Sequence, residues 1–243
     1  MSAFKVGIVA VVIGAIGTAA ILLTPSWFPV AAATQATRQD DLYLALMIMS
    51  SFIMAIVTVF LVYSVWKFRA RPGDEDRDGP PIHGNTTLEI VWTVIPTILV
   101  VAFAIAGGVV LVRNEKTYPN ELNVHVIGQQ FAWTFTYPGG VTSTTLVLEE
   151  GRPTQFDIYS KLHDVIHSFY VPQFRVKADA VPGQVNHTYA TPDRVGTYTL
   201  ICTELCGPGH SLMRAVVRVL PKDKFDAWLA AQQQLQSSTQ GGA

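Results

Sequence analysis

Residues 202–213 read Cys-Thr-Glu-Leu-Cys-Gly-Pro-Gly-His-Ser-Leu-Met, and this run contains both cysteines of the chain. Its candidate metal ligands are Cys202, Glu204, Cys206, His210 and Met213. Thiolate and thioether sulfur prefer copper, zinc or iron, whereas imidazole suits copper and zinc. Thiolate, imidazole and Met together indicate copper that carries out electron transfer. The run therefore predicts a redox copper site.

The spacing of these ligands would also fit one face of a helix. Gly207-Pro208-Gly209 in the middle of the run disfavours that helix, because proline restricts the residue before it and glycine carries a backbone-entropy cost. The flanking segments 196–201 and 214–220 are rich in β-branched and aromatic residues, which is typical of strands. We expect the ligands on a loop between two strands.

The composition indicates a membrane protein. Of 243 residues, 49% are hydrophobic and only 14% are charged, and the net charge of −1 does not suggest nucleic-acid binding. Three stretches carry no charge: residues 6–23, 42–66 and 90–112. Each is close to or longer than the roughly 18 apolar residues needed to cross a bilayer. The second and third stretches predict a transmembrane hairpin within residues 31–114.

The first stretch, within residues 1–30, allows two interpretations. Lys5 precedes the apolar run and Ala31-Ala32-Ala33 follows it, as in a secretory signal that is later removed. The same stretch also fits a retained transmembrane helix. The sequence therefore predicts two transmembrane helices, or three if the first is kept.

Basic residues determine the expected orientation. The segment between the first and second stretches holds only Arg38, whereas the loop after the second stretch holds Lys67, Arg69, Arg71 and Arg77. The more basic loop is expected in the cytoplasm. We therefore expect a multi-pass protein of the bacterial plasma membrane, with everything from about Arg113 onward, including the copper loop, on the extracytoplasmic side.

Residues 115–221 have the size and pattern of one β domain. Candidate strands at 123–127, 131–137, 145–148, 154–159 and 165–171 are separated by turn signals rich in Gly and Pro. Together with the two strands that flank the copper loop, they predict a Greek-key β-sandwich. Residues 222–243 are expected to form a short amphipathic helix, about 222–234, followed by a frayed tail from Ser237.

A metal loop on a sandwich usually takes a further ligand from elsewhere in the chain. Of the upstream histidines in the domain, only His167, which leads into Ser168-Phe169, has a suggestive setting. We interpret His125, His163 and His187 as ordinary surface or hydrogen-bonded histidines.

These features resemble subunit II of cytochrome c oxidase. The resemblance rests on the ligand run, on His167-Ser168-Phe169, on the Pro182-Gly183 turn and on the two helices, and it extends from about Leu42 to Pro221. It implies a cupredoxin-like domain with a dinuclear CuA centre of two copper ions. The implied partners are the catalytic haem-copper subunit I, further oxidase subunits, membrane lipid, and a cytochrome c or cytochrome c domain.

The resemblance also implies roles for the ligands. Cys202 and Cys206 would bridge the two copper ions, with His167 and His210 as terminal ligands. Met213 and the backbone carbonyl of Glu204 would be weak ligands. The Glu204 side chain would reach a magnesium ion at the boundary with subunit I, which suits a carboxylate oxygen.

Three further elements of the family have counterparts here. Glu89, within residues 88–96, matches the carboxylate at the mouth of a proton uptake path, although an acid in the first helical turn also complements the helix dipole. The first tryptophan of the family's aromatic run, where electrons enter, is replaced by Phe131, which also suits packing within the sandwich. Trp133 matches the second tryptophan.

Acidic residues are candidates for docking the donor. Asp164 and Asp157 could attract a basic cytochrome c, although scattered surface acids are the commoner explanation.

The resemblance implies an electron-entry subunit of a proton-translocating respiratory oxidase, with no oxygen chemistry in this chain. The CuA subunit of a nitric oxide reductase is an alternative, because the difference would lie in the partner chain. An extracytoplasmic copper-delivery or thiol redox protein is a second alternative, since it also uses paired cysteines. Glu204, Met213 and the two helices argue against that one.

Overall fold

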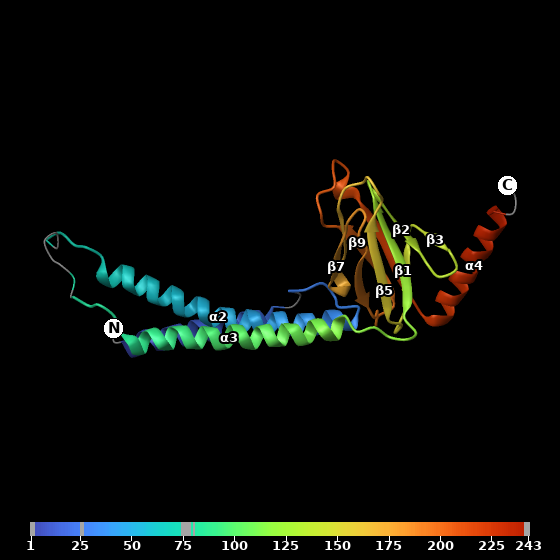
Figure 1. Ribbon diagram of the computed structural model, residues 1–243. Helices are drawn as coiled ribbons and strands as arrows, with labels where there is room; N and C mark the ends of the chain where they lie inside the picture. The colour runs from blue at the N-terminus through green and yellow to red at the C-terminus, as the bar shows by residue number, and fades with distance from the viewer. Residues whose placement is uncertain (1–2, 25–26, 74–78, 80, 241–243) are drawn as a thin grey trace. The chain divides into compact units, whose positions relative to one another are not determined.

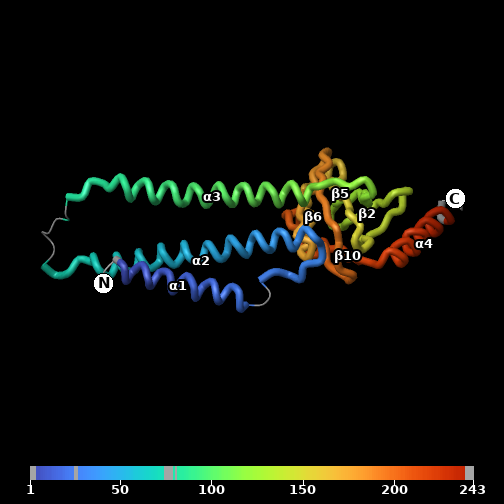
Figure 2. The backbone as a smooth tube through the Cα atoms, turned by 90° about the horizontal axis from the view of Figure 1, so that it is seen from below, coloured from blue at the N-terminus to red at the C-terminus, as the bar shows by residue number. Residues whose placement is uncertain are grey.

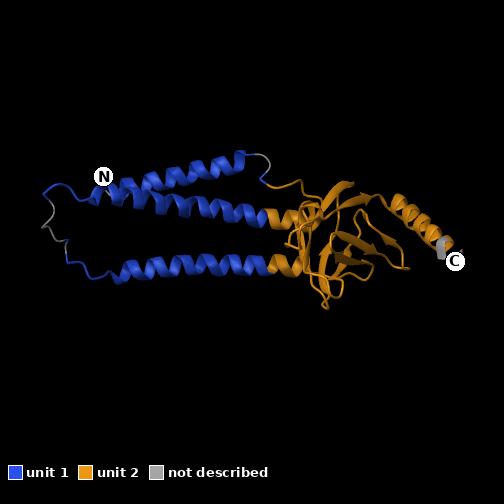
Figure 3. Cartoon of the chain, turned by 90° about the horizontal axis from the view of Figure 1, so that it is seen from above, with its two compact units in different colours: residues 1–27, 41–108 blue, residues 28–40, 109–243 orange. Residues whose placement is uncertain are grey.

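The computed structural model describes residues 3–24, 27–73, 79 and 81–240. Arg77 and tail residues 241–243, which were part of the predictions above, lie outside this range. Figure 1 shows long helices followed by a β domain and a final helix. The chain divides into two compact units, residues 1–27 with 41–108 and residues 28–40 with 109–243 (Figure 3).

Three helices precede the β domain: α1 (Ala3–Leu23), α2 (Thr34–Phe68) and α3 (Thr86–Asn114) (Figure 2). All three are long and apolar enough to cross a membrane. Helices α2 and α3 extend beyond the uncharged stretches from which they were predicted. For α2 the extension is the polar segment Thr34–Asp41. Its charged residues interrupt the apolar pattern, but the backbone remains helical through them.

The first apolar stretch forms a helix that packs against α2 within its unit. A methyl group on Gly14 would lie 2.5 Å from the ring of Phe52, so only glycine permits this close approach. The hydroxyl groups of Thr18 and Ser51 are 3.0 Å apart, which adds a polar contact between the two helices.

The β domain is a sandwich of two five-stranded sheets with a cupredoxin-like fold, as the sequence predicted. The first sheet has the order β3-β2-β1-β5-β8 and the second β4-β10-β9-β6-β7. The strands are β1 (Leu122–Gln129), β2 (Ala132–Thr136), β3 (Thr142–Ser143), β4 (Leu146–Glu149), β5 (Thr154–Ser160), β6 (His167–Val171), β7 (Val176–Ala180), β8 (Asn186–Ala190), β9 (Gly196–Cys202) and β10 (Arg214–Leu220). Two 3-10 turns, Pro172–Phe174 and His210–Leu212, and the helix α4 (Lys222–Gln240) complete the domain.

Strands β3, β7 and β8 were not predicted from the sequence. Each lies at the edge of its sheet, where one side of the strand faces solvent and polar residues are accepted. β8 reads Asn-His-Thr-Tyr-Ala, without the apolar alternation of an inner strand, whereas β7, Val-Lys-Ala-Asp-Ala, alternates but relies on alanine, lysine and aspartate, which are weak strand formers. Helix α4 is longer than expected and includes Ser237–Gln240, where a frayed tail was predicted.

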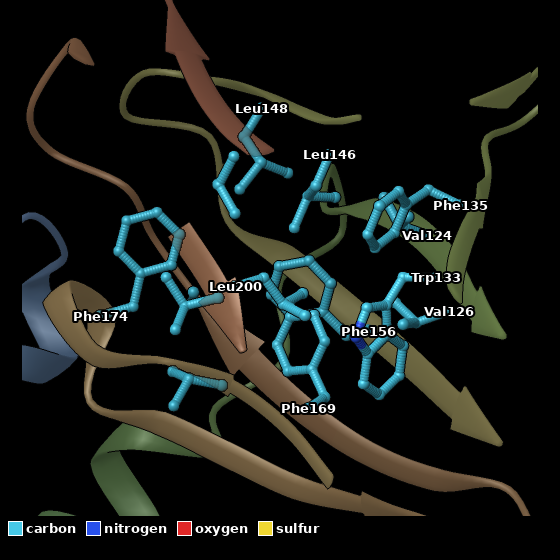
Figure 4. Close-up of a cluster of buried hydrophobic side chains, with 14 of the residues drawn as sticks. Val124, Val126, Trp133, Phe135, Leu146, Leu148, Phe156, Phe169, Phe174 and Leu200 are labelled. Carbon is cyan, nitrogen blue, oxygen red and sulfur yellow. The ribbon is translucent and has the colours of Figure 1, made fainter. Parts of the chain in front are cut away.

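Apolar side chains from both sheets fill the space between them (Figure 4). Along β1, Leu122, Val124 and Val126 alternate inward while His125 faces out, as the two-residue period of a strand requires. Phe156 of β5 meets Phe169 of β6 across the core, with ring centroids 5.3 Å apart. This core holds the strands that carry the metal loop.

The segment Phe28–Asp40 belongs to the same compact unit as the sandwich, although the sequence placed residues 31–114 in the helical hairpin. Ala32 and Ala33 are fully buried, and Ala33 forms a β-bridge with Pro192. Arg175 donates to both carboxylate oxygens of Asp40, at 2.8 and 2.9 Å. A bidentate pair of this kind ties the start of α2 to the β domain.

Tyr137 provides a test of how the core is held. Its hydroxyl accepts from the N–H of Val147 at 2.6 Å and donates to the carbonyl of the same residue at 3.1 Å, and the tyrosine is buried. We predict that Tyr137→Phe lowers the free energy of unfolding by about 1–3 kcal/mol, because both backbone groups lose their partner inside the core. Denaturant unfolding of the purified chain measures this change.

Tyr198→Phe is the matched control, because the Tyr198 hydroxyl donates one solvent-accessible hydrogen bond to Arg194. Equal losses in the two variants would contradict the assigned role of Tyr137.

Candidate metal centre

Three neighbouring strands bring the candidate ligands together. β9 ends at Cys202 and β10 begins at Arg214, directly after Met213, so the loop returns on itself between paired strands. The backbone N–H of Cys202 donates to the Met213 carbonyl at 3.1 Å and closes the base of this loop. On the other side of β9, Phe169 of β6 pairs with Cys202, which places His167 two residues away.

Glycine makes the turn of the loop possible. Gly207 has a φ of 133°, a conformation that other residues rarely adopt. A methyl group on Gly209 would lie 2.5 Å from the ring of Phe131. The Gly-Pro-Gly sequence that argued against a helix therefore also permits the turn and the close contact with Phe131.

The sulfur atoms gather in the interior of the loop. The Sγ atoms of Cys202 and Cys206 are 3.9 Å apart, far longer than a disulfide bond, and both thiols are free and buried. The Cys206 Sγ lies 3.6 Å from Nδ1 of His210 and 3.8 Å from Sδ of Met213. Four of the five candidate ligands within the loop, all but Glu204, thus have side chains gathered around the Cys206 sulfur.

His167 reaches the cluster from β6. Its Nδ1 lies 4.0 Å from the Cys202 Sγ, and the ligand atoms of His167, Cys202 and Cys206 all lie within 4.8 Å of one another. Burial lowers the pKa of His167, against the opposing effect of Asp164, so the ring is held in the neutral form that binds metals.

Burial of the paired thiols has an electrostatic consequence. Burial and the adjacent Cys202 together raise the pKa of Cys206 to about 11. Two neighbouring thiolates are therefore unfavourable without a cation, and a bound metal must displace the thiol protons. The two sulfurs, two imidazoles and thioether fit copper, which prefers soft ligands of this kind.

Glu204 presents its backbone to the cluster and its side chain to solvent. The Glu204 carbonyl oxygen lies 3.3 Å from the Cys202 Sγ, whose thiol donates to it. The side chain is exposed. The role of this carbonyl as a weak copper ligand stays a prediction.

A hydrogen-bond network outside the ligands involves Gln130, to which the sequence assigned no role. Its backbone N–H donates to Asp164 at 3.0 Å, and its side-chain amide donates to the Cys206 carbonyl at 2.5 Å. Asp164 also accepts from the Val165 N–H at 2.7 Å, and its Oδ1 is 3.5 Å from Nε2 of His167. The sequence feature that could have indicated this role is the position of Gln130 directly before the aromatic run that begins at Phe131.

This network changes how Asp164 is interpreted. Although burial acts to raise the pKa of Asp164, the two backbone N–H donors and His167 together outweigh it and lower the pKa. The carboxylate therefore stays charged next to His167. These internal contacts occupy most of the Asp164 side chain. Its role in docking a donor stays a prediction.

The two aromatic residues near the loop have different surroundings. Trp133 is buried, with its ring centroid 6.1 Å from that of His167. Phe131 is 38% exposed and lies against Gly207 and Gly209 instead of packing inside the sandwich. Phe131 thus covers the outside of the loop, and Trp133 supports a ligand from within.

Glu89 lies in the first turn of α3. Its carboxylate accepts from the backbone N–H of Asn85 at 3.3 Å, while the Asn85 side chain accepts from the N–H of Leu88 at 3.1 Å. This reciprocal pattern is a helix N-cap. The structure thus gives Glu89 a capping contact, and its role in proton uptake stays a prediction.

Known families match both parts of the chain. Residues 21–107 match the transmembrane domain of cytochrome c oxidase subunit II, and residues 141–220 match its periplasmic domain. The chain belongs to the cytochrome c oxidase subunit II family. It is therefore a membrane-anchored subunit of an oxidoreductase complex.

Individual relatives agree with this assignment. Cytochrome c oxidase subunit 2 of Alkalihalophilus pseudofirmus is 37% identical over 75% of this chain and 56% of the relative, so the chain spans about half the length of that protein. The corresponding Synechocystis subunit is 33% identical over 84% of this chain and 75% of the relative.

A solved structure is also similar to the β domain. The crystal structure of the periplasmic domain of subunit II of cytochrome oxidase from Bradyrhizobium japonicum matches with a TM-score of 0.46 and 26% identity, covering 49% of this chain and 98% of that one. The family assignment rests on the sequence matches.

Gly128 provides a test of how His167 is placed. A methyl group there would lie 3.0 Å from Cδ2 of His167 and 3.2 Å from the Trp133 ring, both of which are buried. We predict that Gly128→Ala displaces the imidazole and weakens copper binding on the order of tenfold. Copper titration followed by the visible spectrum measures the loss.

Gly79→Ala is the control, because its added methyl group meets no atom of the described residues within 4 Å. Unchanged copper affinity in Gly128→Ala would show that the contact does not position His167.

Proposed function

We propose that this chain receives electrons from a cytochrome c, or from a cytochrome c domain, at a dinuclear CuA centre. It passes them to haem in a catalytic subunit I that reduces oxygen and pumps protons. In this proposal the β domain lies on the extracytoplasmic side of a bacterial plasma membrane. The observation that carries the proposal is the convergence of two free thiols, two imidazoles and a thioether in one cluster, four of them from the loop and one imidazole from β6.

Each ligand has an assigned position in this proposal. Cys202, Cys206, His167 and His210 would hold two copper ions, and Met213 and the Glu204 carbonyl would be weaker ligands. When bound, such a pair of ions takes up and releases one electron shared between them. The chain's contribution is a ligand set held by paired strands and hydrogen bonds, which limits rearrangement when the charge changes.

Electron entry would use the aromatic residues beside the loop. Phe131 is exposed against the loop glycines, and Trp133 contacts His167 edge-on. A donor that binds over Phe131 would come close to the copper without crossing the sandwich. Asp164 and Asp157 remain the proposed docking acids for a basic donor.

The exposed Glu204 side chain supports the proposed link to subunit I. A carboxylate on this residue, whose carbonyl lies next to Cys202, could hold a magnesium ion at the boundary between the two chains. Removal of magnesium from the purified complex should then slow electron transfer to the haem without removing copper.

Cysteine replacements test the copper assignment. We predict that Cys202→Ser and Cys206→Ser each abolish the mixed-valence copper spectrum, because a hydroxyl group is a poor bridging ligand for copper. His125→Gln should leave that spectrum intact, since His125 lies on the outer face of the other sheet. One copper ion per chain, or zinc alone, would sink the dinuclear assignment.

Copurification distinguishes the remaining possibilities. Haem analysis of the native complex, with measured consumption of oxygen and of nitric oxide, separates an oxidase from a nitric oxide reductase. The thiol redox alternative would require the cysteines to cycle through a disulfide during turnover.

Glu89→Gln tests the proposed proton uptake path. Glutamine retains an oxygen that accepts from the Asn85 N–H, so the helix cap should survive. We predict slower turnover of the complex with an unchanged copper spectrum, because the amide does not carry a proton. Full turnover in this variant would leave Glu89 with a capping role only.

A further inference from the structure

Two histidines and an aspartate form a row across the outer face of the first sheet. His125 of β1 is the register partner of Asp157 of β5, and Asp157 is the register partner of His187 of β8. The three side chains therefore lie side by side on adjacent strands. The sequence treated both histidines as ordinary surface residues and Asp157 as a docking acid.

Both imidazoles face the same carboxylate. His187 Nδ1 lies 2.7 Å from Oδ1 of Asp157, and His125 Nδ1 lies 3.4 Å from Oδ2. Gln155, two residues earlier on β5, donates from its side-chain amide to Oδ1 at 2.7 Å and lies 3.4 Å from Nδ1 of His187. Each carboxylate oxygen thus has an imidazole nitrogen beside it.

The burial of the three side chains suits a binding site that opens to solvent. The Asp157 side chain is 15% exposed, whereas those of His125 and His187 are 52% and 51% exposed. The Asp157 carboxylate on β5 is thus the least exposed of the three groups and lies between the imidazoles of β1 and β8. Because both rings are about half exposed, turning them toward an ion above the carboxylate would not disturb the core.

We propose that His125, Asp157 and His187 form a second, mononuclear site for a divalent transition metal such as Cu²⁺ or Zn²⁺. Two imidazoles and a carboxylate suit both ions. Ligands of tetrahedral zinc at about 2.1 Å lie roughly 3.4 Å apart, which matches the His125–Asp157 separation. To hold one ion, the His187 contact must widen and the two imidazoles, which flank the carboxylate from β1 and β8, must turn toward each other. On binding, each ligating nitrogen gives the ion its lone pair, and the ring proton resides on the other nitrogen.

This site differs from the cysteine cluster in position and in chemistry. The cysteine loop joins β9 and β10 of the second sheet, whereas the histidine row lies on β1, β5 and β8 of the first. It contains no sulfur ligand, so an ion there would be held more weakly and would exchange with solvent. A plain set of hydrogen bonds between the histidines and Asp157 is the competing explanation.

Copper titration of the full-length chain distinguishes the two explanations. The purified chain, with its cysteine site loaded and excess copper removed by a chelator, is titrated with Cu²⁺ and followed by electron paramagnetic resonance. We expect one additional mononuclear Cu²⁺ signal per chain, coupled to two nitrogens and displaced by Zn²⁺. His187→Gln and Asp157→Asn should each weaken binding at least tenfold, and the double variant His125→Gln, His187→Gln should abolish the signal.

His163→Asn is the matched control, because His163 is an exposed histidine whose left-handed backbone conformation, with a φ of 70°, asparagine tolerates. This variant should bind the additional copper normally. Absence of the additional signal in the unmodified chain, or its persistence in the double variant, would overturn the site. The dinuclear spectrum is read in the same samples, so failure of the proposed function shows separately, and its retention confirms that each variant is folded.

Discussion

The pairing of β9 with both β10 and β6 is the constraint on which the metal centre depends. Cys202 and Met213 lie at the two ends of one loop, and the antiparallel pairing of β9 and β10 fixes those ends next to each other. The pairing of Phe169 with Cys202 then brings His167 to the same place from a distant part of the sequence. The two-layer core supports these strands, so the ligand geometry is set by the sandwich and not by the loop alone.

The surroundings of the ligands restrict their motion further. Asp164 is held by two backbone N–H groups and lies next to His167, and Gln130 connects that carboxylate to the Cys206 carbonyl. Such contacts orient a metal ligand and keep its charge environment constant. Phe131 closes the outer side of the loop against Gly207 and Gly209. Charged, buried and aromatic groups therefore act together to keep the cluster in one arrangement.

The two faces of the first sheet serve different purposes because side chains alternate along a strand. The inward positions of β1 supply Val124 and Val126 to the core, whereas the outward position between them presents His125 beside Asp157. The same period of two residues that stabilises the domain thus produces the row of possible metal ligands on its surface. A chain that handles copper in one loop would then offer a second, more exchangeable site on the opposite sheet.

Much of this protein was determined by the sequence itself. Long uncharged stretches predict membrane helices because a bilayer admits few charges. The inner strands are recognisable from their apolar residues. The ligand run is specific because its soft donors lie close together in the sequence. The edge strands β7 and β8 could not be found, since half-solvated strands accept polar residues. Only the tertiary structure decided that Phe28–Asp40 packs with the sandwich, that Gln130 and Asp164 surround the ligands, and that His125 and His187 share Asp157. These contacts join residues that are far apart in the chain. Strand order and register bring such residues together, and the packing of the whole domain determines both.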